Sequence, residues 1–285
     1  MQLKIDHITL ASRRLADLVD SFTAIGLAPD YGGSHSNGIS HMSLLCFDDG
    51  SYIELISTLR EGEKSPSWGA YIDANGGPCA WAIRSGDINS DVDYFLSKQL
   101  PTSKPKYISR KRPDGTLVEW YLAVLGKADP GTFHPFLIAD QTPRSYRATP
   151  SVSVSGSEIT GVAIVVIAVK NPDFAVSAFT STYNLAAPRE VVSEKLQSPL
   201  LMFPNSPLAL ITPTQKGDWI DKRLDVFGVC PCAFILATNN MSKSNERFQL
   251  SHDTYWQQQD LAWFDSPGLR ELRLGIISRK GSEHL

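Results

Sequence analysis

Residues 48–57 of the chain read DDGSYIELIS, and residues 113–122 read PDGTLVEWYL. In both stretches an Asp-Gly pair, typical of a tight hairpin turn, precedes a strand-like run of β-branched and aromatic residues. A glutamate follows the glycine at the same distance, as Glu54 in the first stretch and Glu119 in the second. The pattern therefore predicts two copies of one structural unit.

The segments around these two hairpins have the same order. Residues 3–11 predict a strand by alternation, 14–26 a helix with one apolar face, and 42–47 and 51–57 two further strands. The second copy has a strand at 78–84, a helix at 87–99 and strands at 106–111 and 116–124. Each unit thus consists of a strand, a helix and a small sheet.

The C-terminal half repeats the order twice more. The strands are expected at 159–169, 199–203, 207–212, 230–237, 260–264 and 269–278, and the helices at 172–184 and 241–250. Pro231-Cys232-Ala233 repeats Pro78-Cys79-Ala80 at an offset of 232 − 79 = 153 residues. Between the halves, residues 142–157 are rich in Ser, Thr and Pro. We expect domains at 1–145 and 157–285, the second a diverged copy of the first.

Composition limits the class of protein. The 285 residues are 42% apolar and 20% charged, and the net charge is −3, which argues against a nucleic-acid partner or an anionic membrane partner. No apolar run is long enough to span a bilayer, and the N-terminus lacks a signal-peptide core. The four cysteines form no CxxC pair and predict buried free thiols. These features favour a soluble, cytoplasmic protein.

The N-terminal half resembles the glyoxalase-like branch of the vicinal oxygen chelate superfamily, which also includes bleomycin resistance proteins and extradiol dioxygenases. The residues that carry the resemblance are Asp6-His7, Gly32-Gly33-x-His35, His41, Gly50-x-Tyr52-x-Glu54-Leu55-Ile56 and Arg112-Pro113-Asp114-Gly115. The resemblance implies an α+β fold of four βαβββ modules in two pairs. Each pair would form a cup-shaped mixed sheet with helices outside.

The resemblance also implies a divalent metal (Zn, Fe, Mn, Ni or Mg) in the cup, held by the first and last strands of each module. The corresponding positions are His7, Glu54, Cys79 and Glu119. Three of them, His7, Glu54 and Glu119, have the imidazole and carboxylate ligands that suit such an ion. Cys79 replaces the usual histidine, and its thiolate would favour zinc only.

Other residues are candidates for substrate contacts or proton transfer. His35 and His41 flank the glycine-rich segment 32–40; His35 is a candidate substrate contact and His41, with Glu54 and Glu119, a candidate acid or base. The candidate substrate-binding residues near the same cup are Tyr52, Trp81, Arg112 and Trp120. The alternatives are a solvated loop for His35, core packing for Trp81 and a solvated basic run for Arg112.

The C-terminal half has lost this chemistry. Val162 is expected to stand where His7 does, and Ala209 where Glu54 does. We therefore expect the N-terminal cup to bind a small organic molecule, as a metal-dependent lyase, isomerase or dioxygenase. The alternatives are a metal-free binding or resistance-type protein and a metal-free enzyme that uses His and Glu directly. The expected partner is the small ligand, and a homodimer is one further alternative.

Overall fold

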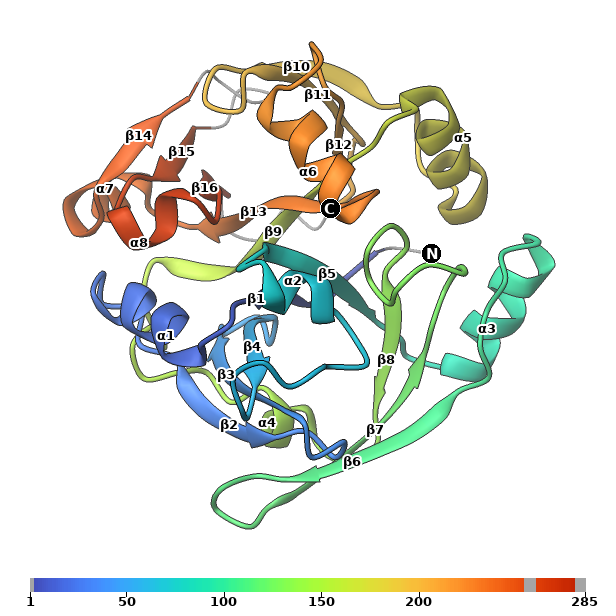
Figure 1. Ribbon diagram of the computed structural model, residues 1–285, viewed down its shortest axis with the longest axis vertical. Helices are drawn as coiled ribbons and strands as arrows, with labels where there is room; N and C mark the ends of the chain where they lie inside the picture. Colours follow the sequence, from blue (N-terminus) through green and yellow to red (C-terminus); the bar gives the residue numbers. More distant parts are fainter. Residues whose placement is uncertain (1–2, 254–259, 280–285) are drawn as a thin grey trace.

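Two eight-stranded sheets, one from each half of the chain, make up the computed structural model, which describes residues 3–253 and 260–279 (Figure 1). The first half contains β1 (Ile5–Ala11), α1 (Leu15–Thr23), β2 (Asp30–Ser34), β3 (Ser40–Cys46), β4 (Tyr52–Thr58), α2 (Gly69–Asp73), β5 (Gly77–Arg84), α3 (Ile88–Ser97), β6 (Lys106–Lys111), β7 (Leu117–Ala123), β8 (Phe136–Asp140) and α4 (Arg144–Arg147). The second half contains β9 (Ile159–Ala168), α5 (Pro172–Tyr183), β10 (Arg189–Ser193), β11 (Ser198–Met202), β12 (Leu208–Ile211), α6 (Trp219–Phe227), β13 (Cys230–Thr238), α7 (Met241–Arg247), β14 (Leu250–His252), β15 (Leu261–Phe264), α8 (Pro267–Arg270) and β16 (Leu274–Ser278).

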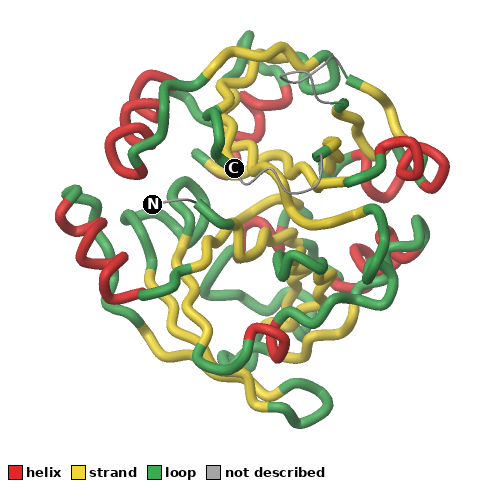
Figure 2. Tube along the Cα trace, turned by 180° about the vertical axis from the view of Figure 1, so that it is seen from behind, coloured by secondary structure: helices red, strands yellow, loops and turns green. Residues whose placement is uncertain are grey.

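The two sheets share one topology. The strand order is β2-β3-β4-β1-β5-β8-β7-β6 in the first sheet and β10-β11-β12-β9-β13-β16-β15-β14 in the second. In the first sheet β1 pairs in parallel with β4 and antiparallel with β5, and β5 pairs in parallel with β8. Both sheets curl, and helices such as α1, α3 and α5 lie outside them (Figures 1 and 2). The predicted α+β fold of four paired βαβββ modules is confirmed.

Local signals in the sequence explain most of these elements. The carboxylate of Asp87 accepts hydrogen bonds from the backbone N–H groups of Asn89 and Ser90, so it caps α3. Asn171 caps α5 in the same way, and Pro172 follows it at the first helical position.

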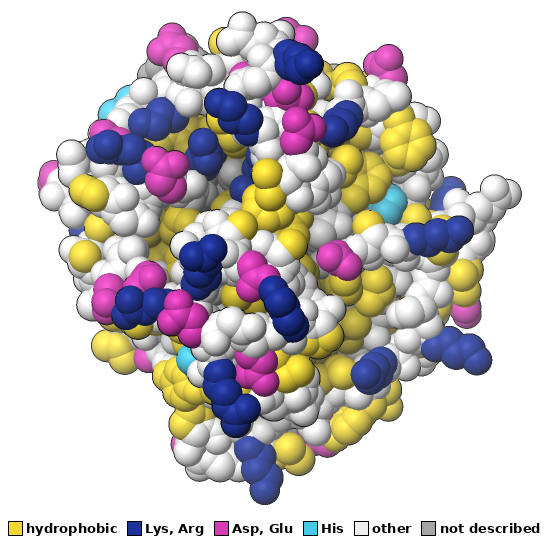
Figure 3. Space-filling model, in the orientation of Figure 1, with side chains coloured by type: hydrophobic (Ala, Val, Ile, Leu, Met, Phe, Trp, Pro, Cys, Tyr) yellow, Lys and Arg dark blue, Asp and Glu magenta, His cyan; other side chains and the backbone are white. Residues whose placement is uncertain are grey.

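Within the described residues no helix combines the length and apolar character needed to cross a membrane. On the face seen in Figure 3, acidic and basic side chains are interspersed.

The alignment of the two Asp-Gly hairpins is wrong in one respect. The first turn joins β3 to β4, whereas the second joins β6 to β7. Glu54 therefore lies on the last strand of its module, beside β1, but Glu119 lies on the third strand of its module, separated from β5 by β8. The strand β8 was not predicted, because its five residues follow Pro135 directly and four of them are buried without alternation.

The predicted alignment of the first strand of the second half, β9, with β1 is also wrong, by two residues. Thr9 is opposite Glu54 on the neighbouring strand, and Val166 is opposite Ala209 in the same way. Because Ala209 is the counterpart of Glu54, the counterpart of His7 is Ile164 and not Val162. An irregularity in the pairing of β9 with β13 separates these two positions. Val162 packs in the large core that joins both halves.

The concave face of the second sheet is filled by its own chain. Two side chains of α6, Ile220 and Leu224, are buried in one apolar cluster with Ile164, Ala209 and Trp263. Trp219 at the start of α6 donates its indole N–H to a backbone carbonyl at Leu196, 2.9 Å away. In the first sheet the segment at the equivalent place carries only the short helix α2. The first cup therefore keeps an open interior.

A partly buried histidine between the two halves is expected to make stability depend on pH. His134 precedes β8, and its Nδ1 lies 2.9 Å from the hydroxyl of Tyr183 on α5. Burial lowers the pKa of His134 from 6.5 to about 4. Because the unfolded chain takes up this proton at a higher pH than the folded protein, stability falls as the pH decreases through this window.

We expect this histidine to remove about 2 kcal/mol of unfolding free energy between pH 7.5 and pH 5. Urea denaturation of the wild type and of His134→Gln at both pH values measures the effect as a difference between the proteins. Other titrating groups cancel in that difference. An equal pH dependence in both proteins would contradict the assignment.

Candidate functional site

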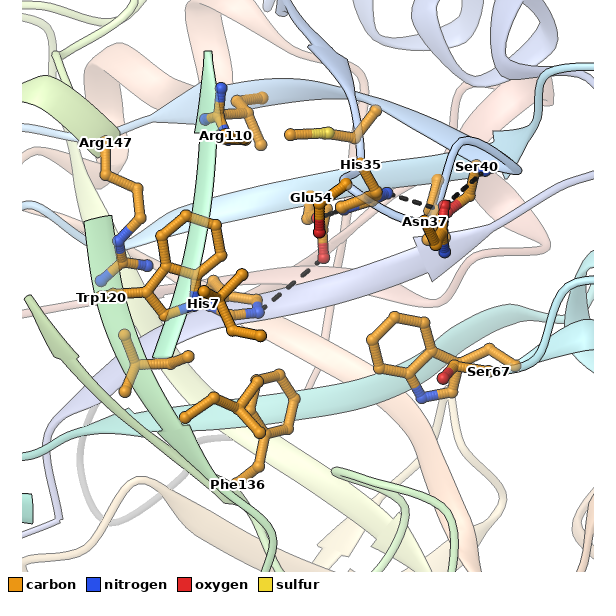
Figure 4. A pocket seen from close by; sticks show the side chains of 18 of the residues that line it. His7, His35, Asn37, Ser40, Glu54, Ser67, Arg110, Trp120, Phe136 and Arg147 are labelled. Carbon is orange, nitrogen blue, oxygen red and sulfur yellow. Dashed lines mark hydrogen bonds and ion pairs between the residues drawn. The ribbon is translucent and has the colours of Figure 1, made fainter. Parts of the chain in front are cut away.

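The concave face of the first sheet encloses a cavity of about 330 Å³, within the size range of small-molecule sites (Figure 4). Its walls come from β1, β3, β4, β6, β7 and β8, and the loops at 35–37 and 65–68 close one side. Most of the lining is apolar. The apolar lining residues are Met42, Leu44, Tyr52, Ile56, Trp68, Ile108, Trp120, Leu122, Phe136 and Ile138.

Glu54 is the carboxylate of this cavity, and it is 7% exposed. Its Oε1 lies 3.1 Å from His35 Nε2, and its Oε2 accepts the hydroxyl of Thr9 at 3.2 Å. His7 Nε2 is 3.8 Å from the same Oε2. Burial raises the pKa of Glu54, but the hydrogen bond and charge of His35, together with His7, outweigh it and bring the pKa to about 2. Glu54 is therefore ionised at neutral pH.

His7 is held by its neighbour in the sequence, Asp6. His7 Nδ1 lies 2.7 Å from Asp6 Oδ1. An irregularity in the pairing of β1 with β5 falls between Ile5 and His7, so the strict alternation of faces is broken there. Because an ionised carboxylate only accepts hydrogen bonds, Nδ1 carries a hydrogen, and Nε2 faces the cavity 3.8 Å from Glu54 Oε2. The imidazole stacks on Tyr52, with ring centroids 4.7 Å apart, and meets the edge of Phe136.

Besides His7, two arginines of α4 contact Asp6 and neutralise its charge. Arg147 donates to Asp6 Oδ1 at 2.8 Å and Oδ2 at 3.0 Å, to Asp140 at 2.7 Å and to the Tyr52 hydroxyl at 3.0 Å. Arg144 also pairs with Asp6, and with Asp140 at 3.1 Å. Burial raises the pKa of Asp6, but Arg147 and His7 outweigh it and hold the pKa well below its usual range. The cluster is balanced, with two carboxylates and two guanidinium groups.

The structure brings five of the predicted site residues together. His7, His35, Tyr52, Glu54 and Trp120 all line the cavity. His35 comes from the glycine-rich loop, and its Nδ1 lies 2.9 Å from the hydroxyl of Ser40, the first residue of β3. The loop therefore places one imidazole opposite the other, with the carboxylate of Glu54 between them (Figure 4).

Two predicted acid–base residues lie on the other face of their strands. Glu119 neighbours Trp120, which lines the cavity, so its side chain points outward, where the hydroxyl of Tyr107 donates to it. His41 likewise lies between two cavity-lining residues of β3, and its Nδ1 is 3.5 Å from the Tyr31 hydroxyl. The structure therefore places neither side chain in the cup, and for Glu119 the reason is the mismatch of the two hairpins.

Three further predicted residues are also outside the cavity. Trp81 is fully buried in the core behind the sheet, and its indole N–H donates to the backbone carbonyl of Phe133 at 3.2 Å. Arg112 lies at the β6–β7 turn, 3.3 Å from the hydroxyl of Thr149. The thiol of Cys79 is buried and donates to a backbone carbonyl of β1, and burial raises its pKa well above the usual value.

The side chains do not fit the metal site that the resemblance implied. The expected ligands His7, Glu54 and Glu119 are not assembled, because Glu119 is on the outer face. The strand next to β5 contributes Phe136 and Ile138 to the cavity instead of a ligand. Within residues 3–253 and 260–279 no cluster of three or more His, Cys, Asp or Glu is arranged to hold a metal. The oxygens of Glu54 already contact both imidazoles and Thr9.

Two arginines of the cavity were missed as site residues. Arg147 follows Asp6 by 141 positions, in a short polar segment with no periodic pattern that could have indicated its place. Arg110 belongs to the same basic run as Arg112, before the β6–β7 turn. Its alternation with Ile108 on β6 was a usable signal, because both side chains line the cavity.

Comparisons with known proteins agree with the fold. A sequence model described as a glyoxalase-like domain matches residues 5–183. No curated protein sequence matches the chain. A hypothetical protein from Staphylococcus aureus has a TM-score of 0.65 at 15% identity, over 98% of this chain and 99% of that one. A mutant of 4-hydroxymandelate synthase from Streptomyces coelicolor has a TM-score of 0.64 at 12% identity, over 100% and 94%. These structural likenesses show the shared fold, and the predicted resemblance is confirmed.

Proposed function

Because the chain belongs to the glyoxalase-like domain family, we propose that its N-terminal cup binds a small, partly apolar organic molecule and moves a proton on it with its own side chains. The observation that supports this proposal is the convergence of two hydrogen-bonded pairs, Asp6–His7 and His35–Glu54, on one largely apolar cavity. Fold alone does not define a reaction, so the proposal rests on these groups.

His7 is the base in this proposal. In its basic form Nε2, which faces the cavity 3.8 Å from Glu54 Oε2, carries no proton, and Asp6 holds the hydrogen on Nδ1. When Nε2 accepts a proton from a carbon next to a carbonyl group, the C–H bond breaks and its electron pair moves to the carbonyl oxygen, which gives an enolate. Asp6 and Glu54 lie on the two sides of the ring and stabilise the imidazolium. The same proton then returns to carbon or exchanges with water.

Tyr52 supplies the hydrogen bond to the developing oxygen anion. It lines the cavity, and its hydroxyl accepts a hydrogen bond from Arg147, which leaves its own hydrogen to donate. Burial raises the pKa of Tyr52, so the hydroxyl keeps its proton at neutral pH. Glu54, predicted from the sequence as an acid or base, has too low a pKa to be an effective base and acts through its charge.

Hydrogen exchange at carbon tests the proposal. We expect the protein to accelerate exchange of the methylene protons of aryl ketones such as phenylacetone with D₂O, followed by ¹H NMR. His7→Gln should lower this rate by about 100-fold, within the range of general acid–base catalysis. His41→Gln is the matched control, because His41 lies outside the cavity, and its rate should not change.

Two results would contradict the proposal. The first is exchange at the uncatalysed rate with every ketone, or at an equal rate in the wild type and His7→Gln. The second is a stoichiometric divalent ion in the purified protein that is lost in His7→Gln, which would support metal-dependent chemistry instead.

A further inference from the structure

We propose that the ligand of the N-terminal cup is an organic acid whose carboxylate is bound by Arg110. This inference rests on the proposed function in one respect, that the cup is the ligand site. It adds the chemical class of the ligand and the residue that selects it. It does not depend on which residue acts as the base.

Arg110 lies on the cavity face of β6 and is 8% exposed. In the view of Figure 4 it lies between Arg147 and His35. Its Nη1 donates to the backbone carbonyl of Gly32 at 2.8 Å. Gly32 is on β2 and Arg110 on β6, the two edge strands of the sheet, so this bond joins the edges and fixes the guanidinium at the cavity wall.

Arg110 and Arg147 are both buried arginines of the cavity, but they differ in the carboxylates that contact them. Arg147 has two carboxylate partners, Asp6 and Asp140. Among the residues that the structure describes, no carboxylate lies within ion-pair distance of Arg110. The acidic group in the same cavity, Glu54, is engaged by His35 and by His7.

A buried cation without an ion-pair contact is costly, because burial removes water and the more distant charge of Glu54 compensates for it only in part. Burial accordingly lowers the pKa of Arg110. A guanidinium group has five N–H donors in a planar fork that matches a carboxylate, and the carbonyl of Gly32 engages one nitrogen. A carboxylate entering the cup therefore supplies both the missing charge and the missing acceptors.

The neighbours of Arg110 define the rest of the ligand. Ile108 on the same strand, Leu44 on β3 and Trp120 on β7 line the same cavity. An anion that is small and fully hydrated would leave this apolar surface uncovered. The site thus suits a carboxylate attached to an aromatic or branched apolar body.

Paired acids and neutral analogues test the inference. The probes are phenylacetate with phenylacetamide, 3-phenylpropionate with 3-phenylpropionamide, and phenylpyruvate with phenylacetone. Binding is measured by quenching of tryptophan fluorescence and by the rise in melting temperature. We expect at least one acid to bind at least about tenfold more tightly than its neutral partner, as a charge-assisted bidentate contact implies.

Three variants locate the effect. Arg110→Gln should remove the preference for the acid, Arg110→Lys should keep part of it, and Arg112→Gln should leave it unchanged. Arg112 is the matched control because it is the same residue type two positions away and lies outside the cavity. Circular dichroism of each variant confirms that the fold is retained, and the ratio of acid to neutral affinity is independent of a uniform loss of binding.

The outcomes separate the two proposals. If acids and neutral analogues bind equally, or the preference survives in Arg110→Gln, the role of Arg110 is overturned while the cup remains a binding site. If neither member of any pair binds, the proposed function fails as well. A preference for acids that disappears only in Arg110→Gln supports the inference.

Discussion

Asp6→Asn is expected to lower the free energy of unfolding by about 3–5 kcal/mol, the cost typical of removing one partner from a buried ion pair. Asp6 is fully buried and holds Arg147, Arg144 and His7. Asparagine keeps the size of the side chain but removes its charge. Asp140 remains as the other carboxylate beside the two guanidinium groups.

Thermal and urea denaturation measure this effect, which corresponds to a melting temperature lower by about 10 °C. The control is Asp73→Asn, which removes the exposed pair between Asp73 and Lys64 and should change stability by less than about 0.5 kcal/mol. A loss below about 1 kcal/mol in Asp6→Asn would show that the cluster does not depend on this charge.

Glu54→Gln is expected to lower the rate of carbon-acid exchange by about 100-fold or more while the fold is retained. Glutamine preserves the shape of the side chain and its contact with Thr9, but it cannot stabilise the imidazolium of His7 by charge. The same role is predicted for Glu119 from the sequence, so Glu119→Gln is the discriminating control. Because Glu119 lies on the outer face, its replacement should not change the exchange rate.

Glu54→Gln should also change how the free energy of unfolding depends on pH. The folded protein holds the pKa of Glu54 at about 2, below its unfolded value, so the unfolded state binds this proton first as the pH falls. The stability that Glu54 contributes is complete above about pH 4.5 and is lost from there toward pH 2. Glu54→Gln should lack this part of the acid transition. Equal acid sensitivity in both proteins would contradict the low pKa.

Short-range patterns in the sequence were sufficient to predict the fold class and the repeat of its modules. The alternation of residues 3–11, the Asp-Gly turns and the cap at Asp87 each depend on neighbours within a few positions. The repeats then extended one module to four. These patterns did not predict the strand β8, because its buried residues do not alternate with polar ones. Without β8, Glu119 was assigned to the strand equivalent to that of Glu54.

The candidate site was predictable only where a strand carries its own pattern. His7 and Glu54 lie on adjacent parallel strands, and their shared face follows from alternation. The cluster of Asp6, Arg144 and Arg147 could not be predicted from alternation, because two irregular features of the structure bring its residues together. One is the broken pairing beside Asp6 on β1, and the other is the short helix α4, which approaches β1 from more than 130 residues away.

The helix α6 distinguishes the two cups, because its side chains fill the interior of the second cup and the first cup has only the short helix α2 at the equivalent place. The second cup contains a part of its own chain, so its interior is complete once the protein has folded. Under the proposed function, the first cup is filled by a ligand from solution, and the free energy of unfolding of this half then depends on the ligand concentration. Binding would then stabilise the N-terminal half as the ligand concentration rises, whereas the packing of the C-terminal half would not depend on it directly.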